Sequence, residues 1–378
     1  MRVLYICHWE NLTGGAALAC WNMVLDMKAR YKIEPCILVK GEGTVAEECR
    51  RNNIEVVVMP HYWWYCGENF KDKIKSKVKN IFNKFYYARI LKYFADKKFN
   101  LVHSNSSVTD IGDVIAQKLN IPHVWHLREY GLKDYGLHFV KNKKIVTAKF
   151  NRANKLIAIS RDVYDYYAKY MRLCDEENIK IIYNGIKINT EYHKKYNLKI
   201  NFCMAGMLCN GKNQIMALRA CKILRERNNN FILNFIGEGG DEALLKNFVH
   251  ENNLNDCVKF WGFRSDIQEI LKNMDVGLML SKSEAFGRVT VEYMLNYMPV
   301  IGVNTGATPE IISDGTGFIC DLDDAQRLSD IMYYEFIKQP EKIISMGQNA
   351  RDHAVKNFPL EKNTDEIYEI YQEVLNGK

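Results

Sequence analysis

The sequence predicts an α/β protein made of two Rossmann-like, doubly wound domains that face each other across a cleft. Three observations lead to this prediction. Short β-branched runs alternate with helical runs almost throughout, which is typical of parallel sheets covered by helices. The chain has 378 residues, enough for two domains of ordinary size. A polar run over 187–199 lacks any periodicity, so we expect it to link the domains.

The N-terminal domain is predicted to span 1–190, with strands and helices in regular alternation. Strands are expected at 2–7, 33–39, 54–59, 101–103, 122–126, 155–159 and 179–183. Helices are expected at 15–30, 44–52, 75–95, 108–119 and 161–170.

The C-terminal domain is predicted to span 191–359 and to repeat this alternation. The last run, 360–378, has apolar residues at helical spacing, so we expect a helix that docks on one of the domains, with the N-terminal domain as one candidate. Strands are expected near 201–206, 231–236, 257–260, 275–280 and 299–303, and helices near 213–227, 241–252, 266–273 and 288–298.

Composition narrows the compartment and the partners. The net charge of +7 is a modest basic excess, and no recognised nucleic-acid module accompanies it, so we expect no nucleic-acid partner. No run approaches the roughly 20 apolar residues that cross a bilayer, and the first apolar run is too short for a signal peptide. The eleven cysteines lack metal-site spacing and suit reduced, buried thiols. We expect a cytoplasmic protein, either free or peripheral at the inner face of the membrane.

The stretch from Ser281 to Glu292 carries the strongest functional signal. It follows a short apolar strand and leads through a glycine-containing loop into a helix. Glu284 would lie at the carboxyl end of the strand, where open α/β sheets bind ligands. Glu292 would lie one and a half turns into the helix, and Gly287 would let a phosphate approach the helix N-terminus. Two carboxylates around a phosphate cradle suggest binding of two sets of sugar hydroxyls.

The segment from about 179 to 320 resembles the retaining glycosyltransferases of family 4, the group 1 transferases with the GT-B fold. Each motif alone is weak, but their order and separation over about 140 residues are specific. The N-terminal half is similar only through Thr13-Gly14-Gly15-Ala16 and Trp125-His126. The matching residues are Tyr183-Asn184-Gly185, Gly206, Lys212, Gly237-Glu-Gly239, Val258-Lys-Phe-Trp-Gly262, Asp266, Ser281-x-x-Glu284-x-Phe-Gly287, Glu292, Pro299-Val-Ile, Gly306, Glu310-Ile-Ile and Gly317.

The resemblance implies a role for each matching residue. Glu292 would hold the ribose hydroxyls of a nucleotide sugar, and Glu284 the hydroxyls of the donor sugar. Lys212 would neutralise the diphosphate, since a doubly charged leaving group needs a fixed cation. The implied donor site consists of Gly15, Gly206, Lys212, Glu284, Ala285, Phe286, Gly287, Arg288, Val289 and Glu292.

One position departs from the family pattern. Many relatives carry an arginine after the glycine that matches Gly206, where this chain has Met207. Either diphosphate binding is one cation weaker, or another residue substitutes, and Arg288 beside the phosphate loop is the first candidate.

In the N-terminal half, His126 follows a predicted strand and is, with Glu284, the predicted catalytic residue. By resemblance its imidazole would face the reacting sugar; the alternative is a structural histidine. Gly14 and Gly15 lie where a dinucleotide fingerprint would lie, but the full fingerprint is absent. They form either a tight strand-to-helix turn or, by resemblance, a loop near the donor phosphates.

No metal or other cofactor is predicted. Asp321-Leu-Asp323 fits a manganese-binding D-x-D pattern, but it precedes a helical run at 325–337 and suits a helix cap better. Fixed cations and helix dipoles would act in place of a metal.

The basic charge is concentrated between Glu68 and Lys98, with nine lysines and one arginine against three acids. Ile74, Val78, Ile81 and Phe85 form an apolar stripe there, and the aromatic run 61–65 precedes it. Two interpretations stay open for 61–98: a patch that contacts an anionic membrane, or a helix packed on its own sheet with solvated lysines.

These observations predict a hexosyltransferase that moves a sugar from a nucleotide-diphosphate sugar to a saccharide or lipid-linked saccharide acceptor. By resemblance it would retain the anomeric configuration and serve bacterial surface polysaccharide or glycolipid assembly. The alternatives are a non-catalytic nucleotide- or sugar-binding protein and a Rossmann oxidoreductase.

Overall fold

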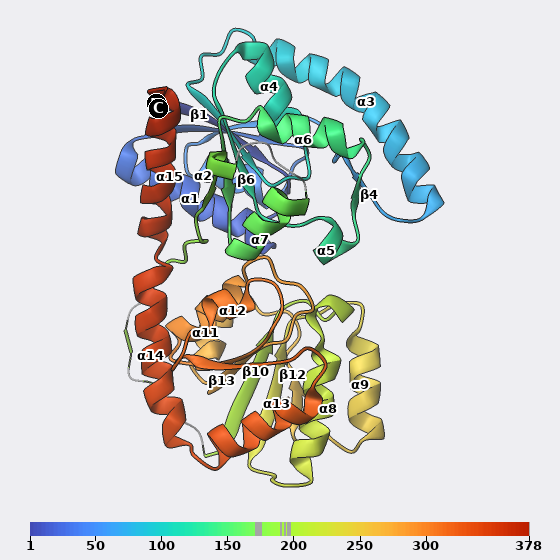
Figure 1. Ribbon diagram of the computed structural model, residues 1–378, viewed down its shortest axis with the longest axis vertical. Helices are drawn as coiled ribbons and strands as arrows, with labels where there is room; N and C mark the ends of the chain where they lie inside the picture. The colour runs from blue at the N-terminus through green and yellow to red at the C-terminus, as the bar shows by residue number, and fades with distance from the viewer. Residues whose placement is uncertain (171–175, 190, 193, 195–197, 378) are drawn as a thin grey trace. The chain divides into compact units, whose positions relative to one another are not determined.

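The computed structural model describes residues 1–170, 176–189, 191–192, 194 and 198–377. The chain divides into two compact units, which we call unit 1 (Met1–Lys187 with Leu360–Lys378) and unit 2 (Ile188–Pro359). Each unit is a parallel sheet with helices on both faces (Figure 1). The predicted fold class, two Rossmann-like doubly wound domains, is therefore confirmed.

Unit 1 contains, in its described residues, a seven-stranded parallel sheet in the order β3-β2-β1-β5-β6-β8-β9. The order reverses at β1, so the carboxyl ends of β1 and β5 border the point where such sheets bind ligands. The strands are β1 (Arg2–Cys7), β2 (Glu34–Val39), β3 (Glu55–Val58), β5 (Leu101–Asn105), β6 (His123–Leu127), β8 (Lys155–Ala158) and β9 (Ile179–Ile181).

Several features of unit 1 differ from the prediction, among them the helix α6 (Lys143–Asn151), which was not predicted. A short antiparallel ribbon joins β4 (Tyr65–Cys66) to β7 (His138–Phe139), and two-residue strands are too short to show a periodicity. The basic helix starts five residues early, at Phe70, because the Asn69 side chain caps it by accepting from the Asp72 amide at 2.8 Å. The helices are α1 (Gly15–Tyr31), α2 (Thr44–Arg51), α3 (Phe70–Phe94), α4 (Ile111–Leu119), α5 (Leu132–Tyr135), α6 (Lys143–Asn151), α7 (Arg161–Asp165), η1 (Tyr166–Tyr170) and η2 (Glu176–Asn178).

The C-terminal helix α15 (Leu360–Leu375) belongs to unit 1 and packs on α1. The Tyr31 and Tyr368 rings stack with centroids 3.8 Å apart. Ile367, Ile370 and Tyr371 are buried in the same core as β1 and α1. The apolar stripe of 360–375 is therefore a packing face for the N-terminal sheet.

Unit 2 contains, among the residues described, a six-stranded parallel sheet in the order β12-β11-β10-β13-β14-β15. β15 was not predicted, because its four residues lack a distinctive pattern. The strands are β10 (Ile200–Ala205), β11 (Phe231–Ile236), β12 (Val258–Phe260), β13 (Val276–Met279), β14 (Val300–Val303) and β15 (Gly317–Cys320). The helices are η3 (Asn210–Lys212), α8 (Gln214–Arg225), α9 (Glu242–Glu251), α10 (Ile267–Leu271), α11 (Arg288–Leu295), α12 (Thr308–Ile311), α13 (Ala325–Ile331), η4 (Met332–Ile337) and α14 (Glu341–Asn357).

The predicted linker, 187–199, lies partly outside the described residues. Its described part contacts unit 2: Lys194 Nζ donates to the Asn296 carbonyl at 2.9 Å, and Tyr192 OH to the same oxygen at 3.2 Å. Across the described residues as a whole, no helix is both long enough and apolar enough to cross a membrane.

Candidate functional site

The first loop of the site joins β10 to α8 at the carboxyl edge of the unit 2 sheet. Gly206 leaves β10 with φ +144°, a conformation that favours glycine. The turn Asn210–Lys212 follows, and Asn213 with φ +61° begins α8. These backbone turns bring Lys212 to the strand end.

The second loop joins the neighbouring strand β13 to α11 and carries Glu284. Gly287 has φ +79° and begins α11. The Glu284 carbonyl accepts from the Ala307 amide at 2.8 Å. A Cβ at Gly306 would lie 2.3 Å from that carbonyl, so only glycine allows this close approach. The family-like glycines therefore shape the loop that holds Glu284.

The two loops meet because β10 and β13 are adjacent. The Lys282 amide donates to the Gly211 carbonyl at 2.9 Å. Lys212 Nζ pairs with Glu284 Oε2 at 2.5 Å; the Lys212 side chain is partly exposed and the Glu284 side chain is mostly buried. Burial works to lower the pKa of Lys212, but the Glu284 carboxylate outweighs it and raises that pKa. The structure thus brings together a fixed ammonium and a carboxylate that were predicted to contact one donor.

Glu292 forms a second pair one turn into α11. Its Oε1 lies 3.6 Å from Arg288 Nη2, and both side chains are mostly buried. Burial raises the pKa of Glu292 and lowers that of Arg288, and their mutual attraction opposes both shifts. Arg288 is therefore engaged with the acid predicted to bind ribose. Met207, the departing position, is 64% exposed.

Three buried polar atoms around the Lys212–Glu284 pair lack a hydrogen-bond partner among the described residues. They are Asn213 Oδ1, Ser283 Oγ and Thr290 Oγ1, each next to or within one turn of a predicted donor-binding residue. An unsatisfied buried polar atom costs about 1–3 kcal/mol, so such atoms mark a place that a polar ligand can complete.

The other predicted donor-site residues follow in the same loop and helix. Ala285 and Val289 are half-buried. The Phe286 side chain is buried against Phe358, with ring centroids 5.7 Å apart, so only its backbone is placed for a ligand. Gly287 supplies the glycine start of α11.

In unit 1, polar side chains gather at the carboxyl ends of β5 and β6. The Arg128 guanidinium is buried and donates to Asn105 Oδ1, to Asn184 Oδ1 at 2.5 Å and to His126 Nδ1 at 3.3 Å. We call these four residues, with His8, the unit 1 cluster. His8 Nδ1 lies 2.8 Å from the Asn105 carbonyl.

His126 is fully buried in this cluster. Burial, together with the charge of Arg128, holds the pKa of His126 well below its ordinary value, so the ring is neutral. Since Nδ1 accepts from Arg128, its proton lies on Nε2, a buried atom with no partner in the described part of the chain. Gly15 is exposed at the first turn of α1. At the preceding residue, Gly14, an added Cβ would meet no atom within 4 Å.

Glu129, which follows Arg128, also carries a buried carboxylate at this strand end. Its buried Oε1 accepts from Ser106 Oγ at 2.9 Å and from the Ser107 amide and hydroxyl at 2.5 and 2.6 Å. Ser106 has φ +109°, a strained conformation for a serine. Burial raises the pKa of Glu129 to about 6 despite the donors from Ser107. The available signal was its place after a strand that neighbours another polar strand end.

The D-x-D pattern does not cap a helix as predicted. Asp324, one residue later, caps α13 by accepting from the Arg327 amide at 2.8 Å. Asp323 has φ +63° and accepts from Asn213 Nδ2 at 3.0 Å. Among the described residues, no cluster of three or more histidine, cysteine or acidic side chains could hold a metal ion.

Comparisons with known proteins agree with this geometry. Residues 187–353 match the family "Glycosyl transferases group 1", and residues 44–190 match "Glycosyltransferase Family 4". The N-acetyl-alpha-D-glucosaminyl L-malate synthase of Bacillus anthracis is 26% identical over 248 residues, which cover 63% of this chain and 63% of that enzyme.

Two further similarities cover more of the chain. The UDP-Gal:alpha-D-GlcNAc-diphosphoundecaprenol alpha-1,3-galactosyltransferase of Escherichia coli is 24% identical over 315 residues, 76% of this chain and 79% of that enzyme. The crystal structure of Anabaena HepE in complex with UDP has a TM-score of 0.81 and 20% identity, covering 99% of this chain and 100% of that one. The chain belongs to the group 1 glycosyltransferases of family 4, enzymes with the GT-B fold.

Proposed function

We propose that this enzyme transfers a sugar from a nucleoside diphosphate sugar to a hydroxyl of a saccharide carried on a lipid, with retention of the anomeric configuration. The observation that carries the proposal is the Lys212–Glu284 pair, held at 2.5 Å at the carboxyl ends of adjacent strands. The names of two relatives, a UDP-galactose transferase with a diphosphoundecaprenol acceptor and a UDP-bound protein, support this substrate class.

The donor diphosphate would lie between Lys212 and the start of α11. Transfer breaks the bond between the anomeric carbon and the phosphate oxygen, forms a bond to the acceptor oxygen on the same face, and passes the proton of the acceptor hydroxyl to the leaving phosphate oxygen. Negative charge then grows on the leaving diphosphate, and a fixed ammonium with helix N–H groups stabilises it. Diphosphate binding would loosen the Lys212–Glu284 pair and leave Glu284 to accept from sugar hydroxyls.

Glu292, mostly buried on α11, would accept hydrogen bonds from the ribose hydroxyls. The unit 1 cluster, with neutral His126, would lie on the acceptor side. We propose that no metal or other cofactor takes part, because Lys212 and α11 supply the positive charge, and chelation with EDTA should leave the rate unchanged.

A lipid-linked acceptor requires the enzyme to work at the membrane that carries the lipid. The proposal therefore includes a cytoplasmic location at the inner face of that membrane, in the assembly of surface polysaccharide or glycolipid.

The test is a screen of UDP, GDP and ADP and their sugars by thermal shift, followed by nucleotide release with the sugar that stabilises most. We expect one nucleotide to raise the melting temperature and its sugar to be consumed, with NMR of the product showing the donor's anomeric configuration. Glu284→Gln is the matched variant and should lose turnover. Absence of binding and turnover for every donor would contradict the proposal.

A further inference from the structure

Helix α3 turns its polar side chains toward the rest of unit 1 and its apolar side chains outward, the reverse of an ordinary surface helix. Over 70–87, the side chains that face unit 1 are polar: Ser76 and Asn83 are buried, and Asn80 and Tyr87 half-buried. The outward side chains are apolar and are 46% to 77% exposed. They are Phe70, Ile74, Val78, Ile81, Phe82 and Phe85, which we call the α3 face.

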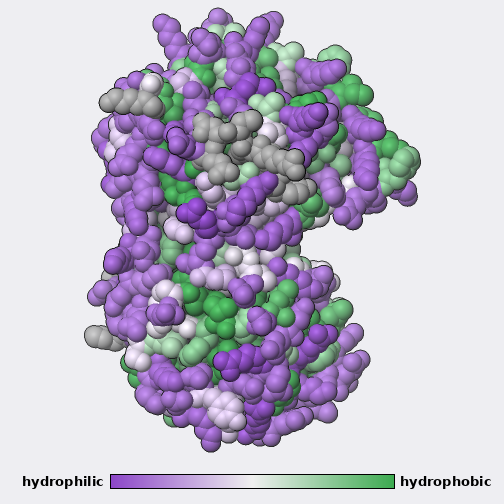
Figure 2. Space-filling view, viewed as in Figure 1, coloured by the Kyte–Doolittle hydropathy of each residue, from purple (hydrophilic) through white to green (hydrophobic). Residues whose placement is uncertain are grey.

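Helix geometry shows that these two sets lie on opposite sides. At about 100° per residue, the six residues of the α3 face fall within one arc of about 120°, and Ser76, Asn83 and Tyr87 lie across the axis. In Figure 1, α3 lies along the outer edge of unit 1, and Figure 2 shows hydrophobic residues gathered on that edge, interspersed with hydrophilic ones.

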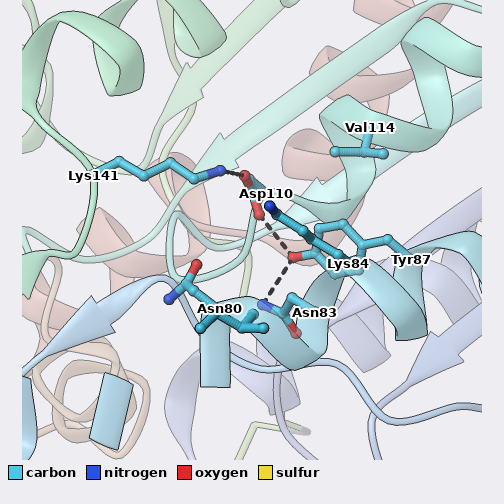
Figure 3. A pocket seen from close by; sticks show the side chains of 8 residues that line it. Asn80, Asn83, Lys84, Tyr87, Asp110, Val114 and Lys141 are labelled. Atoms are coloured by element: carbon cyan, nitrogen blue, oxygen red, sulfur yellow. Dashed lines mark hydrogen bonds and ion pairs between the residues drawn. The ribbon is translucent and has the colours of Figure 1, made fainter. Parts of the chain in front are cut away.

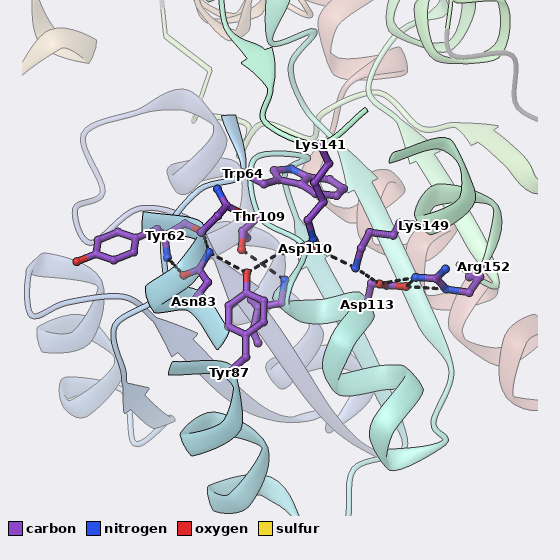
Figure 4. A network of polar contacts seen from close by, with 12 residues as sticks. Tyr62, Trp64, Asn83, Tyr87, Thr109, Asp110, Asp113, Lys141, Lys149 and Arg152 are labelled. Atoms are coloured by element: carbon purple, nitrogen blue, oxygen red, sulfur yellow. Dashed lines mark hydrogen bonds and ion pairs between the residues drawn. The ribbon is translucent and has the colours of Figure 1, made fainter. Parts of the chain in front are cut away.

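Polar contacts fix α3 in this orientation. Asn83 pairs with both the amide and the carbonyl of Tyr62, at 2.7 and 3.0 Å. Tyr87 OH donates to Asp110 at 2.7 Å, and Lys141 donates to the same carboxylate at 2.8 Å. Figure 4 shows this network continuing through Lys149 to the buried Asp113.

Burial works to raise the pKa of Asp110, but Lys149 and Lys141 outweigh it and lower that pKa, so the carboxylate stays charged. A cavity of about 280 Å³ lies beside these groups, lined by Asn80, Ile81, Lys84 and Tyr87 of α3 as well as by Asp110, Val114 and Lys141 (Figure 3). Rotating α3 to bury its apolar side would place phenylalanine and isoleucine against this charged, polar surface. The apolar side of α3 therefore has to point away from unit 1.

The charge of α3 identifies what covers the face. The helix carries seven lysines and one arginine against one acid, Asp72. Lys73, Lys77 and Lys84 flank the apolar arc on one side, and Lys71, Lys75 and Arg89 lie along its other edge. Long cationic stems beside an apolar stripe suit the headgroup boundary of an anionic bilayer. A second copy would bring an equally positive face against this one, which charge repulsion opposes.

Three of the five residues in the aromatic run 61–65 are not available to a membrane. Trp64, Tyr65 and His61 are buried, and Trp64 stacks on Trp125 at 5.8 Å. These three residues are thus part of the core, whereas Tyr62 and Trp63 are half-buried.

We infer that the α3 face docks unit 1 on an anionic lipid surface, with Phe70, Ile81 and Phe85 inserted and the flanking lysines on lipid phosphates. This inference deepens the proposed function. It rests on that proposal because a lipid-linked acceptor would be reached at such a surface. Vesicle binding is nevertheless measured without donor or acceptor, so the two proposals can fail separately. Binding without glycosyl transfer would leave this inference standing.

The experiment is flotation of the full chain with vesicles of phosphatidylcholine alone and with 30% phosphatidylglycerol. We expect binding to the anionic vesicles, at least tenfold weaker to the neutral ones, and weakened by added salt because surface charges are screened. Phe70→Ser/Ile81→Ser/Phe85→Ser and Lys73→Gln/Lys75→Gln/Lys77→Gln should each weaken binding at least tenfold. Because the changed side chains are exposed, the melting temperature should stay unchanged.

Matched controls carry the same changes elsewhere. Leu244→Ser/Phe263→Ser/Ile344→Ser alters three exposed apolar side chains of unit 2, and Lys118→Gln/Lys144→Gln/Lys362→Gln removes three exposed lysines of unit 1. Both controls should bind like the wild type. Failure of the wild type to bind anionic vesicles, or equal losses in variants and controls, would overturn the inference. So would a concentration-dependent dimer that the α3 apolar variant abolishes, since a second copy would then cover the face.

Discussion

The two units have the same doubly wound architecture, but the charged side chains at their strand ends differ in burial and in the partners that hold them. In unit 2, Lys212 is partly exposed and pairs with Glu284, whose side chain is 17% exposed. In unit 1, Arg128 and His126 are buried, and Arg128 is held by the amide oxygens of Asn105 and Asn184. Exposed ions can exchange partners at little cost, whereas buried ones depend on the partners that the fold supplies.

We expect this difference to determine how each unit responds to substitution. Side chains of the unit 2 loops can give up their mutual contacts to a charged ligand. The side chains of the unit 1 cluster stay in place, because moving them would leave a buried charge without its hydrogen-bond partners. Substitutions in unit 2 should therefore change binding and turnover, and changes of protonation in unit 1 should change stability.

The largest expected effect is acid unfolding of unit 1. Burial lowers the pKa of His8 to about 3, and of His61 and His123 to about 4, from 6.5. Between about pH 4 and 6.5 the unfolded chain binds more protons, so stability falls as the pH falls, by roughly 3 kcal/mol per histidine. Glu129, with its pKa raised to about 6, opposes this by about 2 kcal/mol.

Five of the six tryptophans lie in unit 1, so intrinsic fluorescence reports this transition. The free energy of unfolding, measured by urea titration from pH 4.5 to 6.5, should rise with pH. His61→Asn keeps a donor for the Met59 carbonyl, which His61 Nδ1 contacts at 3.0 Å, and should reduce the slope by about one proton. His250→Asn, on the exposed side of α9, is the control and should leave the slope unchanged. A flat pH profile for the wild type would contradict the burial argument.

The next effect is loss of turnover on removing the Lys212 ammonium. Lys212→Ala should lower kcat/KM at least 100-fold, or about 3 kcal/mol, because it removes the ammonium that would stabilise the charge of the leaving diphosphate. Lys282→Ala removes a lysine of the facing loop, which donates to Asn210 Oδ1 at 2.7 Å, and should change the rate less than threefold. Equal losses in both variants would assign the effect to general loop charge.

The sequence was sufficient to predict the site residues of unit 2 more fully than the polar cluster of unit 1. Backbone demands are visible in sequence: Gly287 at φ +79° and the close approach of Gly306 to Glu284 require glycine, and the spacing of those glycines marks the loop. The pairing of Glu292 with Arg288 could also be anticipated, because they are four residues apart on a helix.

Unit 1 was harder because its contacts join distant segments through buried polar groups. Asn105, Arg128 and Asn184 come from three strand ends, and no local pattern shows that they converge. The orientation of α3 depends on Asn83 finding the backbone of Tyr62, a tertiary contact that overrides the usual rule that apolar stripes face inward. The apolar stripe was visible in sequence, but the side it faces was not.

A smaller effect is expected from replacing Gly306, the glycine that packs against the loop holding Glu284. Gly306→Ala should destabilise unit 2 by about 2 kcal/mol and weaken nucleotide binding, because the new methyl group would meet the Glu284 carbonyl at 2.3 Å and φ is +54°. Gly211→Ala, in the facing loop, has no atom within 4 Å of the new group and should be nearly neutral. Similar urea midpoints for both variants would show that the loop relaxes around the methyl group.

The smallest effect should follow Glu292→Ala, since its proposed role is to hold hydroxyls and not to counter charge. We expect about tenfold weaker calorimetric affinity for the preferred nucleoside diphosphate, or about 1.4 kcal/mol. The same change removes the acid that pairs with Arg288, so affinity for inorganic pyrophosphate should hold or rise. Glu269→Ala, an exposed acid of α10, should alter neither affinity. If nucleotide and pyrophosphate weaken together, Glu292 acts by ordering the phosphate loop; if only the nucleotide weakens, it acts on the ribose, and the unit 2 site recognises hydroxyls and charge with different side chains.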